Sequence, residues 1–243
     1  MEINRDGIVL WLKKIIICTI SLILLGIGCG LNVATSQGAD PITVFYDGLS
    51  KAFHVSVGFT ASVLNFSLIL LVLVFSFISA KINKAKGFNE MIKYLFKYIS
   101  IGTVIYLMVL GNFIDFGIWI YNLLNVPKDL PQTFVYQVGI SLIGCLFCFV
   151  GLGGFMSIDI GIDPWTAFAV ILAKKCNTSF RLIKIILDAL TLLFGWLLGG
   201  TVGIITLFCV VCGGPVIQKS AEILDKMLPK MLQSNCENQV KKQ

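Results

Sequence analysis

Two segments of this chain repeat each other, and each one interrupts a long apolar stretch. The first reads Gly38-Ala39-Asp40-Pro41-Ile42-Thr43, and the second reads Gly161-Ile162-Asp163-Pro164-Trp165-Thr166, at an offset of 123 residues. The register continues beyond the motif, because the same offset aligns Asn65 with Asp188. Paired interruptions of this kind are typical of the two halves of a membrane transporter, where they indicate the binding site.

The composition indicates the class of protein. Hydrophobic residues make up 57% of the chain and charged residues 13%, with a mean hydropathy of +0.90. These values are typical of an integral membrane protein, and 243 residues supply about six spans of ~20 residues each. The expected spans cover residues 14–34, 57–79, 98–122, 134–156, 181–198 and 201–218.

The distribution of basic residues predicts the orientation. With the N-terminus inside, all of the 19 Lys and Arg residues except Lys51 and Lys128 fall at cytoplasmic ends. We therefore expect both termini in the cytoplasm of a bacterium and the spans in its plasma membrane. The net charge of +6 is explained by this bias and by anionic lipid headgroups, so no nucleic acid partner is expected.

Three spans per half is an odd number, so the second half enters the membrane in the opposite sense. We therefore predict an all-α protein of two inverted three-helix repeats, over residues 1–123 and 124–219. Residues 220–243 form a cytoplasmic tail. Its apolar residues recur at helical spacing beside Lys226 and Lys230, which indicates an amphipathic anchor.

A short helix follows each Asp-Pro. Asp favours the N-cap and Pro the first helical position, so helices are expected over 41–53 and 164–175. At ~1.5 Å per residue each reaches roughly 20 Å, less than the ~30 Å hydrocarbon core, so neither can span. They are either re-entrant or interfacial half-helices. In the first copy an interfacial helix would turn these residues inward: Ile42, Phe45, Leu49 and Phe53.

At these residues the chain resembles the YczE/YyaS/YitT family of bacterial multi-pass membrane proteins, over about residues 15–220. The resemblance is carried by the Gly-x-Asp-Pro motifs with the following Thr, the Ser56/Gly58 and Ser179 regions, and the glycine-rich stretch 195–206. The first half lacks a match to that last stretch. The resemblance implies a polytopic membrane protein, often presumed to transport, and it names no substrate.

Six polar residues are candidates for contact with a substrate or ion. They are Asp40, Thr43, Asn65, Asp163, Thr166 and Asp188. A carboxylate at membrane depth costs ~2.5 to 3.5 kcal/mol and is usually retained for a reason. That reason can also be structural: helix capping at the two motifs, and a helix–helix hydrogen bond at the second-helix positions. The remaining motif residues are assigned a structural role: Gly38, Pro41, Gly161 and Pro164.

Enzyme and metal signals are weak. The pairs Cys145/Cys148 and Cys209/Cys212 could supply soft metal ligands, but buried Cys is commonly a small hydrophobe, and no metal or cofactor is expected. There is no P-loop sequence. Asp47 with Asp163 could form a protease dyad, but the duplication at Asp40 already explains Asp163. We predict a protein that is not an enzyme.

The sequence therefore predicts a secondary transporter or exporter of a small solute or ion, working by alternating access between the repeats. The first alternative is a membrane accessory or assembly protein, and the next is a passive channel. Half-helix N-termini favour anions, whereas Asp40 and Asp163 favour cations, so the solute's charge stays open. Besides the lipid bilayer and the solute, a homodimer partner is also left open.

Overall fold

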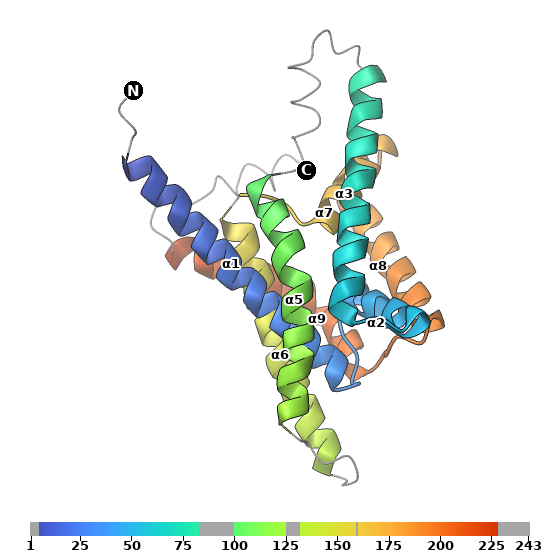
Figure 1. Cartoon of the computed structure of the whole chain (residues 1–243). Helices are drawn as coiled ribbons and strands as arrows, with labels where there is room; N and C mark the ends of the chain where they lie inside the picture. The colour runs from blue at the N-terminus through green and yellow to red at the C-terminus, as the bar shows by residue number, and fades with distance from the viewer. Residues whose placement is uncertain (1–4, 83–99, 125–131, 159, 228–243) are drawn as a thin grey trace.

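The structure is a computed structural model of the chain and describes residues 5–82, 100–124, 132–158 and 160–227. Its regular elements are all helices: α1 (Arg5–Ala34), α2 (Pro41–Phe53), α3 (Val57–Ile82), α5 (Ile101–Leu123), α6 (Gln132–Ser157), α7 (Pro164–Lys175), α8 (Phe180–Leu197) and α9 (Ile204–Met227) (Figure 1). The all-α prediction is confirmed over these ranges, and the two half-helices have the expected bounds.

Five of these helices are long and apolar enough to cross a membrane: α1, α3, α5, α6 and α9. Large apolar side chains such as Phe66, Leu146 and Leu207 are exposed on their outward faces, as expected for surfaces that contact lipid. The sixth expected span is α8, which has only 18 residues and carries Arg181, Lys184 and Asp188. The chain is a helical membrane protein, and α8 is its most polar long helix.

The centre of the molecule is the crossing of α1 and α6, which run in opposite directions (Figure 1). A Cβ added to Gly28 would lie 2.5 Å from the Gly144 carbonyl oxygen, and one added to Gly151 would lie 2.6 Å from the Ser21 carbonyl oxygen. Only glycine allows backbones to approach this closely. Glycines therefore set the distance between α1 and α6, and α5 packs against another face of α1 through Gly117.

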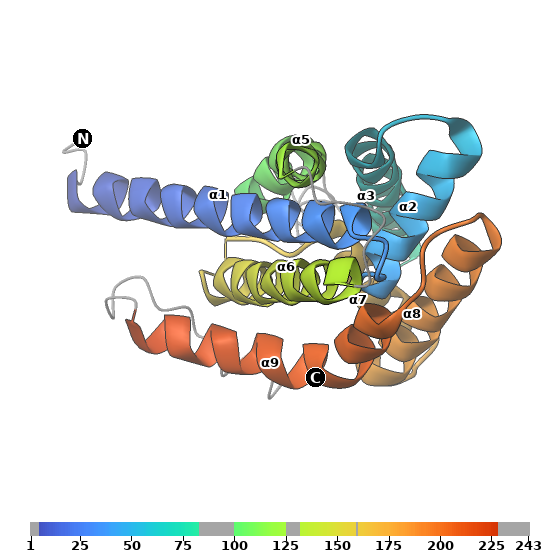
Figure 2. The same ribbon diagram turned by 90° about the horizontal axis from the view of Figure 1, so that it is seen from below.

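Each half-helix packs against helices of both halves of the chain. α2 packs against α8, and α7 packs against α3, so each half-helix contacts the second long helix of the other half (Figure 2). The α2–α8 contact is close, because an added Cβ on Gly48 would lie 2.3 Å from the carbonyl oxygen of Gly195. The predicted halves are thus interleaved rather than placed side by side.

Each Gly-x-Asp-Pro segment is hydrogen-bonded to the start of the last long helix of the other half. The Ile205 amide donates to the Gln37 carbonyl (3.1 Å), and the Gly102 amide donates to the Ile160 carbonyl (3.1 Å). These two bonds occupy equivalent positions in the two motifs. Gly38 has a φ of +96° and lies against Gly203, which explains why glycine is needed there.

The buried face of α2 differs from the one expected for an interfacial helix. Its buried residues are Thr43, Val44, Tyr46, Asp47, Gly48 and Ser50. Phe53, which was expected inward, is 70% exposed. Ile42, Phe45 and Leu49 are partly buried, so Phe53 is the one of these four residues that departs from the interfacial alternative. The burial of polar side chains shows that protein, rather than water, covers this face of α2, as its contacts with α3 and α8 require.

The last helix extends through the expected boundary near residue 219. α9 continues without a break to Met227 and contains Pro215, so the beginning of the predicted amphipathic tail prolongs the last span. The rest of that tail lies outside the described residues. The same is true of Lys128, Asp159 and the basic connection over 83–99.

Orientation can be tested at the exposed ends of the half-helices. A variant carrying His54→Cys should be labelled by an impermeant maleimide on intact cells, whereas native Cys176, which is exposed after α7, should react only after permeabilisation. Cys236 is replaced by Ser so that the two signals are separate. Labelling of both positions from the same side would contradict the inverted arrangement.

The close approach of α2 to α8 generates a stability prediction. Gly48→Ala should lower the free energy of unfolding by about 1–3 kcal/mol, because its Cβ would meet the Gly195 backbone. The matched control is Gly139→Ala in α6, where no atom lies within 4 Å of an added Cβ. Thermal unfolding in detergent measures both. A Gly48→Ala variant as stable as Gly139→Ala would show that the contact is not close.

Candidate functional site

Both motif aspartates cap their own half-helices. Asp40 accepts a hydrogen bond from the Thr43 amide (3.3 Å), and Asp163 accepts one from the Thr166 amide (2.8 Å). Each cap residue is extended and each following Pro is the first helical residue. The capping role is therefore confirmed for both. Capping uses one oxygen of each carboxylate, and the remaining acceptor positions stay available.

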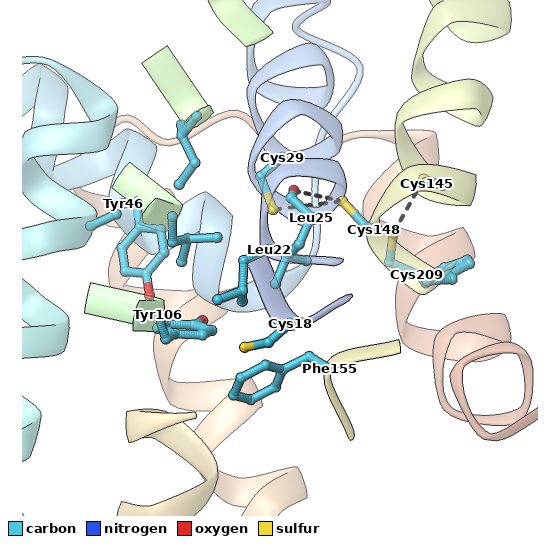
Figure 3. Packing of buried hydrophobic residues seen from close by; sticks show 14 of the residues in the cluster. Cys18, Leu22, Leu25, Cys29, Tyr46, Tyr106, Cys145, Cys148, Phe155 and Cys209 are labelled. Carbon is cyan, nitrogen blue, oxygen red and sulfur yellow. Dashed lines mark hydrogen bonds between the residues drawn. The ribbon is translucent and has the colours of Figure 1, made fainter. Parts of the chain in front are cut away.

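A tyrosine on α2 connects the two motifs. Burial raises the pKa of Tyr46 well above its ordinary value; a hydrogen bond from Asn65 opposes this, and the nearby charges of Asp40 and Asp163 add to the rise. The two half-helices also share their packing partners, since α2 and α7 each contact both α3 and α8. Figure 3 shows the Tyr46 hydroxyl directed toward Tyr106 of α5.

Asn65 completes this contact from α3. Its amide nitrogen donates to the Tyr46 hydroxyl (2.9 Å) and to the Ala61 carbonyl (2.8 Å). The residue is only 2% exposed, and its side-chain oxygen has no hydrogen-bond partner. A buried amide oxygen left unpaired costs about 1–3 kcal/mol, so such groups commonly meet a water or a ligand.

Asp188 occupies the equivalent position on α8. Its carboxylate accepts two bonds from Lys184 (2.7 and 2.9 Å) and one from the Trp165 indole nitrogen (3.2 Å). Trp165 is the residue after Pro164, so Asp188 faces the first turn of α7. The expected helix–helix hydrogen bond is confirmed, and the expected burial is only partial.

Asp40 is the carboxylate most affected by its surroundings. Burial raises its pKa, hydrogen bonds from Thr43 oppose that shift, and the charges of Lys184 and Asp188 act on it in opposite senses. The residue keeps part of its surface accessible although protein surrounds it. The hydrogen bonds place the candidates in two sets: Asn65 bonds to Tyr46 of α2, which Asp40 caps, and Asp188 bonds to Trp165 of α7, which Asp163 caps. Thr166 lies in the first turn of α7, where its amide bonds to Asp163.

A second polar group ties the far end of α2 to the turn after α8. The Asp47 carboxylate accepts bonds from Lys51 (2.7 Å) and from the Thr201 amide (2.8 Å), and Lys51 also reaches the Thr201 hydroxyl (2.8 Å). We call these three residues the α2 latch. Asp47 is 3% exposed, and its carboxylate is already held by these partners.

The cysteines pair across helices. Cys29 lies 3.6 Å from Cys148, and Cys145 lies 3.6 Å from Cys209, measured between sulfur atoms (Figure 3). Cys145 and Cys148 therefore point to different partners. Within the part of the chain that the structure describes, no three His, Cys, Asp or Glu side chains are grouped so that they could hold a metal ion.

Asp115 lies on α5 and is partly buried. It accepts bonds from the Ser56 hydroxyl (2.7 Å) and the Gly58 amide (2.8 Å), so it caps α3 from α5. The reason is the Gly58–Gly111 approach, which brings the start of α3 against α5. Asp115 is a structural clamp at the start of α3.

Three members of the site were not predicted: Tyr46, Trp165 and Lys184. Lys184 precedes Asp188 by four residues, a spacing that places both on one helix face, so this pair could have been found from the sequence. Tyr46 has Ala169 as its repeat counterpart, so the repeat gave no signal for it. Trp165 has Ile42 as its repeat counterpart, so the repeat gave no signal for Trp165 either.

Comparison with known proteins gives the same picture of a membrane protein without an assigned activity. A family described as "Family of unknown function (DUF6198)" matches residues 12–221. An uncharacterized protein of Haemophilus influenzae is 24% identical over 215 residues, covering 88% of this chain and 86% of its own. The uncharacterized membrane protein YczE of Bacillus subtilis is 22% identical over 200 residues, covering 82% and 81%.

No solved structure matches this chain. The resemblance to YczE that the motifs predicted is confirmed by the similarity to that protein. The printed descriptions of the family and of both relatives name no substrate, so they favour no solute for this chain.

Proposed function

The chain belongs to the family of unknown function DUF6198, and from its geometry we propose that it is a secondary transporter or exporter of a small solute. One observation carries the proposal. Both half-helices pack against the same two helices, α3 and α8, which supports a shared site at the two half-helix starts rather than two separate ends at opposite surfaces. Convergent half-helix starts between two repeats are the usual site of transporters.

The alternating-access mechanism requires inverted repeats, and several contacts support that arrangement. α1 and α6 are antiparallel, as the first helices of inverted halves must be. The bonds Ile205–Gln37 and Gly102–Ile160 pair the halves reciprocally. Six spans, with α8 as the polar one, would leave both termini on the same side, and the distribution of Lys and Arg favours the cytoplasmic side of a bacterial plasma membrane.

The α2 latch supplies one gate of such a mechanism. It bonds the C-terminal half of α2 to the turn after α8. The latch lies on the outer side of the membrane if Lys51 has the predicted orientation. Opening toward the outside would need α2 to separate from α8, which breaks the bonds of Asp47 and exposes the Gly48–Gly195 contact. The latch therefore favours a site that is closed to the outside.

Neutralising a motif aspartate tests the site without removing its cap. Asn is as good an N-cap as Asp, so Asp163→Asn keeps the bond from Thr166 and removes the charge. If the charge contacts the solute, flux into proteoliposomes should fall about tenfold or more, the loss that corresponds to ~1.4 kcal/mol. The solute is first identified by a thermal-shift screen of metabolites and ions.

The matched control is Asp115→Asn, which can keep its bonds to Ser56 and Gly58. Its flux should stay close to that of the unmodified protein at equal expression. Equal flux in Asp163→Asn and Asp115→Asn would reduce Asp163 to its capping role. Saturable, coupled flux excludes the passive channel, and no flux of any solute would favour the accessory role.

The gate can be tested by linking α2 to the turn after α8. Lys51→Cys combined with Thr201→Cys, bridged by a short reducible dithiol reagent, should stop flux, since the two native side chains are 2.8 Å apart at their tips. Reduction should restore it. The single variants serve as controls, with Cys176 and Cys236 replaced by Ser. Unchanged flux in the bridged protein would show that α2 does not move.

A further inference from the structure

An asparagine lies on the outer face of α5, in the middle of a span. Asn112 is the twelfth of the 23 residues of α5, so roughly 16 Å of helix lies on either side of it at about 1.5 Å per residue. Its side chain is exposed. Met108 and Phe116, one turn before and one turn after it, are 69% and 43% exposed. The amide therefore lies at the depth of the hydrocarbon core, between apolar side chains that face lipid.

The Asn112 amide is only partly satisfied by its own helix. Its nitrogen donates to the Met108 carbonyl (2.8 Å), and no described residue donates to its oxygen. An Asn side chain offers two N–H donors and one oxygen acceptor, so one donor and the oxygen remain for a partner outside α5. Lipid tails supply no such partner, and an unpaired amide in hydrocarbon is costly. Asn side chains in this situation commonly bond to a neighbouring helix.

The inner faces of α5 are already occupied. An added Cβ on Gly117 would lie 2.5 Å from the Ile27 carbonyl oxygen of α1, and one on Gly111 would lie 2.4 Å from the Gly58 carbonyl oxygen of α3. Figure 2 shows α5 at the edge of the described helices, on the side of α1 away from α6. A partner for Asn112 must therefore come from outside the described part of the chain.

The helix beyond Asn112 presents a firm apolar surface. The rings of Phe116 and Trp119 stack with their centroids 5.4 Å apart, and Phe113 packs edge-on against Phe116 (5.9 Å). Trp119 is 53% exposed. Aromatic and Met side chains are the residues enriched at protein interfaces. We call Met108, Asn112, Phe116 and Trp119 the α5 face; they lie at helical spacing over three turns.

We propose that the α5 face is the interface of a parallel homodimer, in which the Asn112 amides of two copies bond to each other. A second copy fits because the amide is self-complementary: each has one donor and one acceptor left, which is what an identical amide requires. Copies inserted in the same orientation carry Asn112 at the same depth. A two-fold axis along the membrane normal then pairs the amides by two reciprocal bonds. The inference does not rest on the transport proposal.

The test measures association of the full chain in liposomes. Copies fused to donor and acceptor fluorescent proteins are mixed, and energy transfer is followed as lipid dilutes them. Asn112→Leu should raise the apparent dimer Kd about tenfold or more, and Asn112→Gln, which keeps the amide, should raise it less. The matched control is Ser67→Ala on α3. Ser67 is also exposed, but its hydroxyl already donates to the Val63 carbonyl (2.8 Å), so the Kd should not change.

A photo-cross-link locates the interface without changing Asn112. Phe116 is replaced by the photoreactive p-benzoylphenylalanine, which should join two copies through their α5 helices. The same replacement at Leu146 of α6, which is 56% exposed, should not join them. Thermal unfolding of the diluted protein checks the fold. Asn112→Leu should be no less stable than the unmodified chain, because an apolar side chain then faces lipid; if it is less stable, the Phe116 cross-link decides.

Three results would overturn the proposal. The first is no energy transfer at any protein-to-lipid ratio. The second is an unchanged dimer Kd in a stably folded Asn112→Leu variant. The third is a dimer that cross-links from Leu146 but not from Phe116, since this would place the interface on α6.

Discussion

The rest of the structure depends on one constraint: in lipid, the unpaired amides at the start of a helix must be satisfied by the protein itself. Two helices begin inside this molecule, and Asp40 and Asp163 satisfy their first turns. The carbonyls just before each motif are satisfied by α9 and α5, through Gln37 and Ile160. Each Gly-x-Asp-Pro segment is therefore bonded on one side to its own half-helix and on the other side to a helix of the other half. These bonds hold the two halves together.

The sequence predicted this framework well because its signals are local. Capping by Asp40 and Asp163 and the bounds of α2 and α7 follow from the order Asp-Pro and from turn chemistry. The long apolar runs fix α3, α5 and α6 within a few residues, and they fix the end of α1 at Ala34. Even the partners of Asn65 and Asp188 were expected to be on neighbouring helices, and each is bonded to an aromatic residue of its own half-helix.

What the sequence could not predict depends on packing between distant segments. The burial of Asp47 and Gly48 on α2 could not be predicted, because the partner of Gly48 is Gly195, nearly 150 residues away, and no local pattern identifies it. Asp115 could not be recognised as a clamp for α3, since that role requires the approach of Gly58 to Gly111. Tyr46 became visible as a site residue only when its hydroxyl was placed against Asn65 of α3.

The departures from symmetry are where a direction of transport would arise. At equivalent second-helix positions, Asn65 is neutral and bonds to Tyr46, whereas Asp188 is charged and bonds to Lys184 and Trp165. The two halves therefore present different chemistry to the same centre. If the repeats exchange conformations, the two states are not energetically equivalent, because the α2 latch uses Asp47, whose repeat counterpart is the apolar Val170. In such an exchange the repeat symmetry would provide two related states, and these substitutions would set the balance between them.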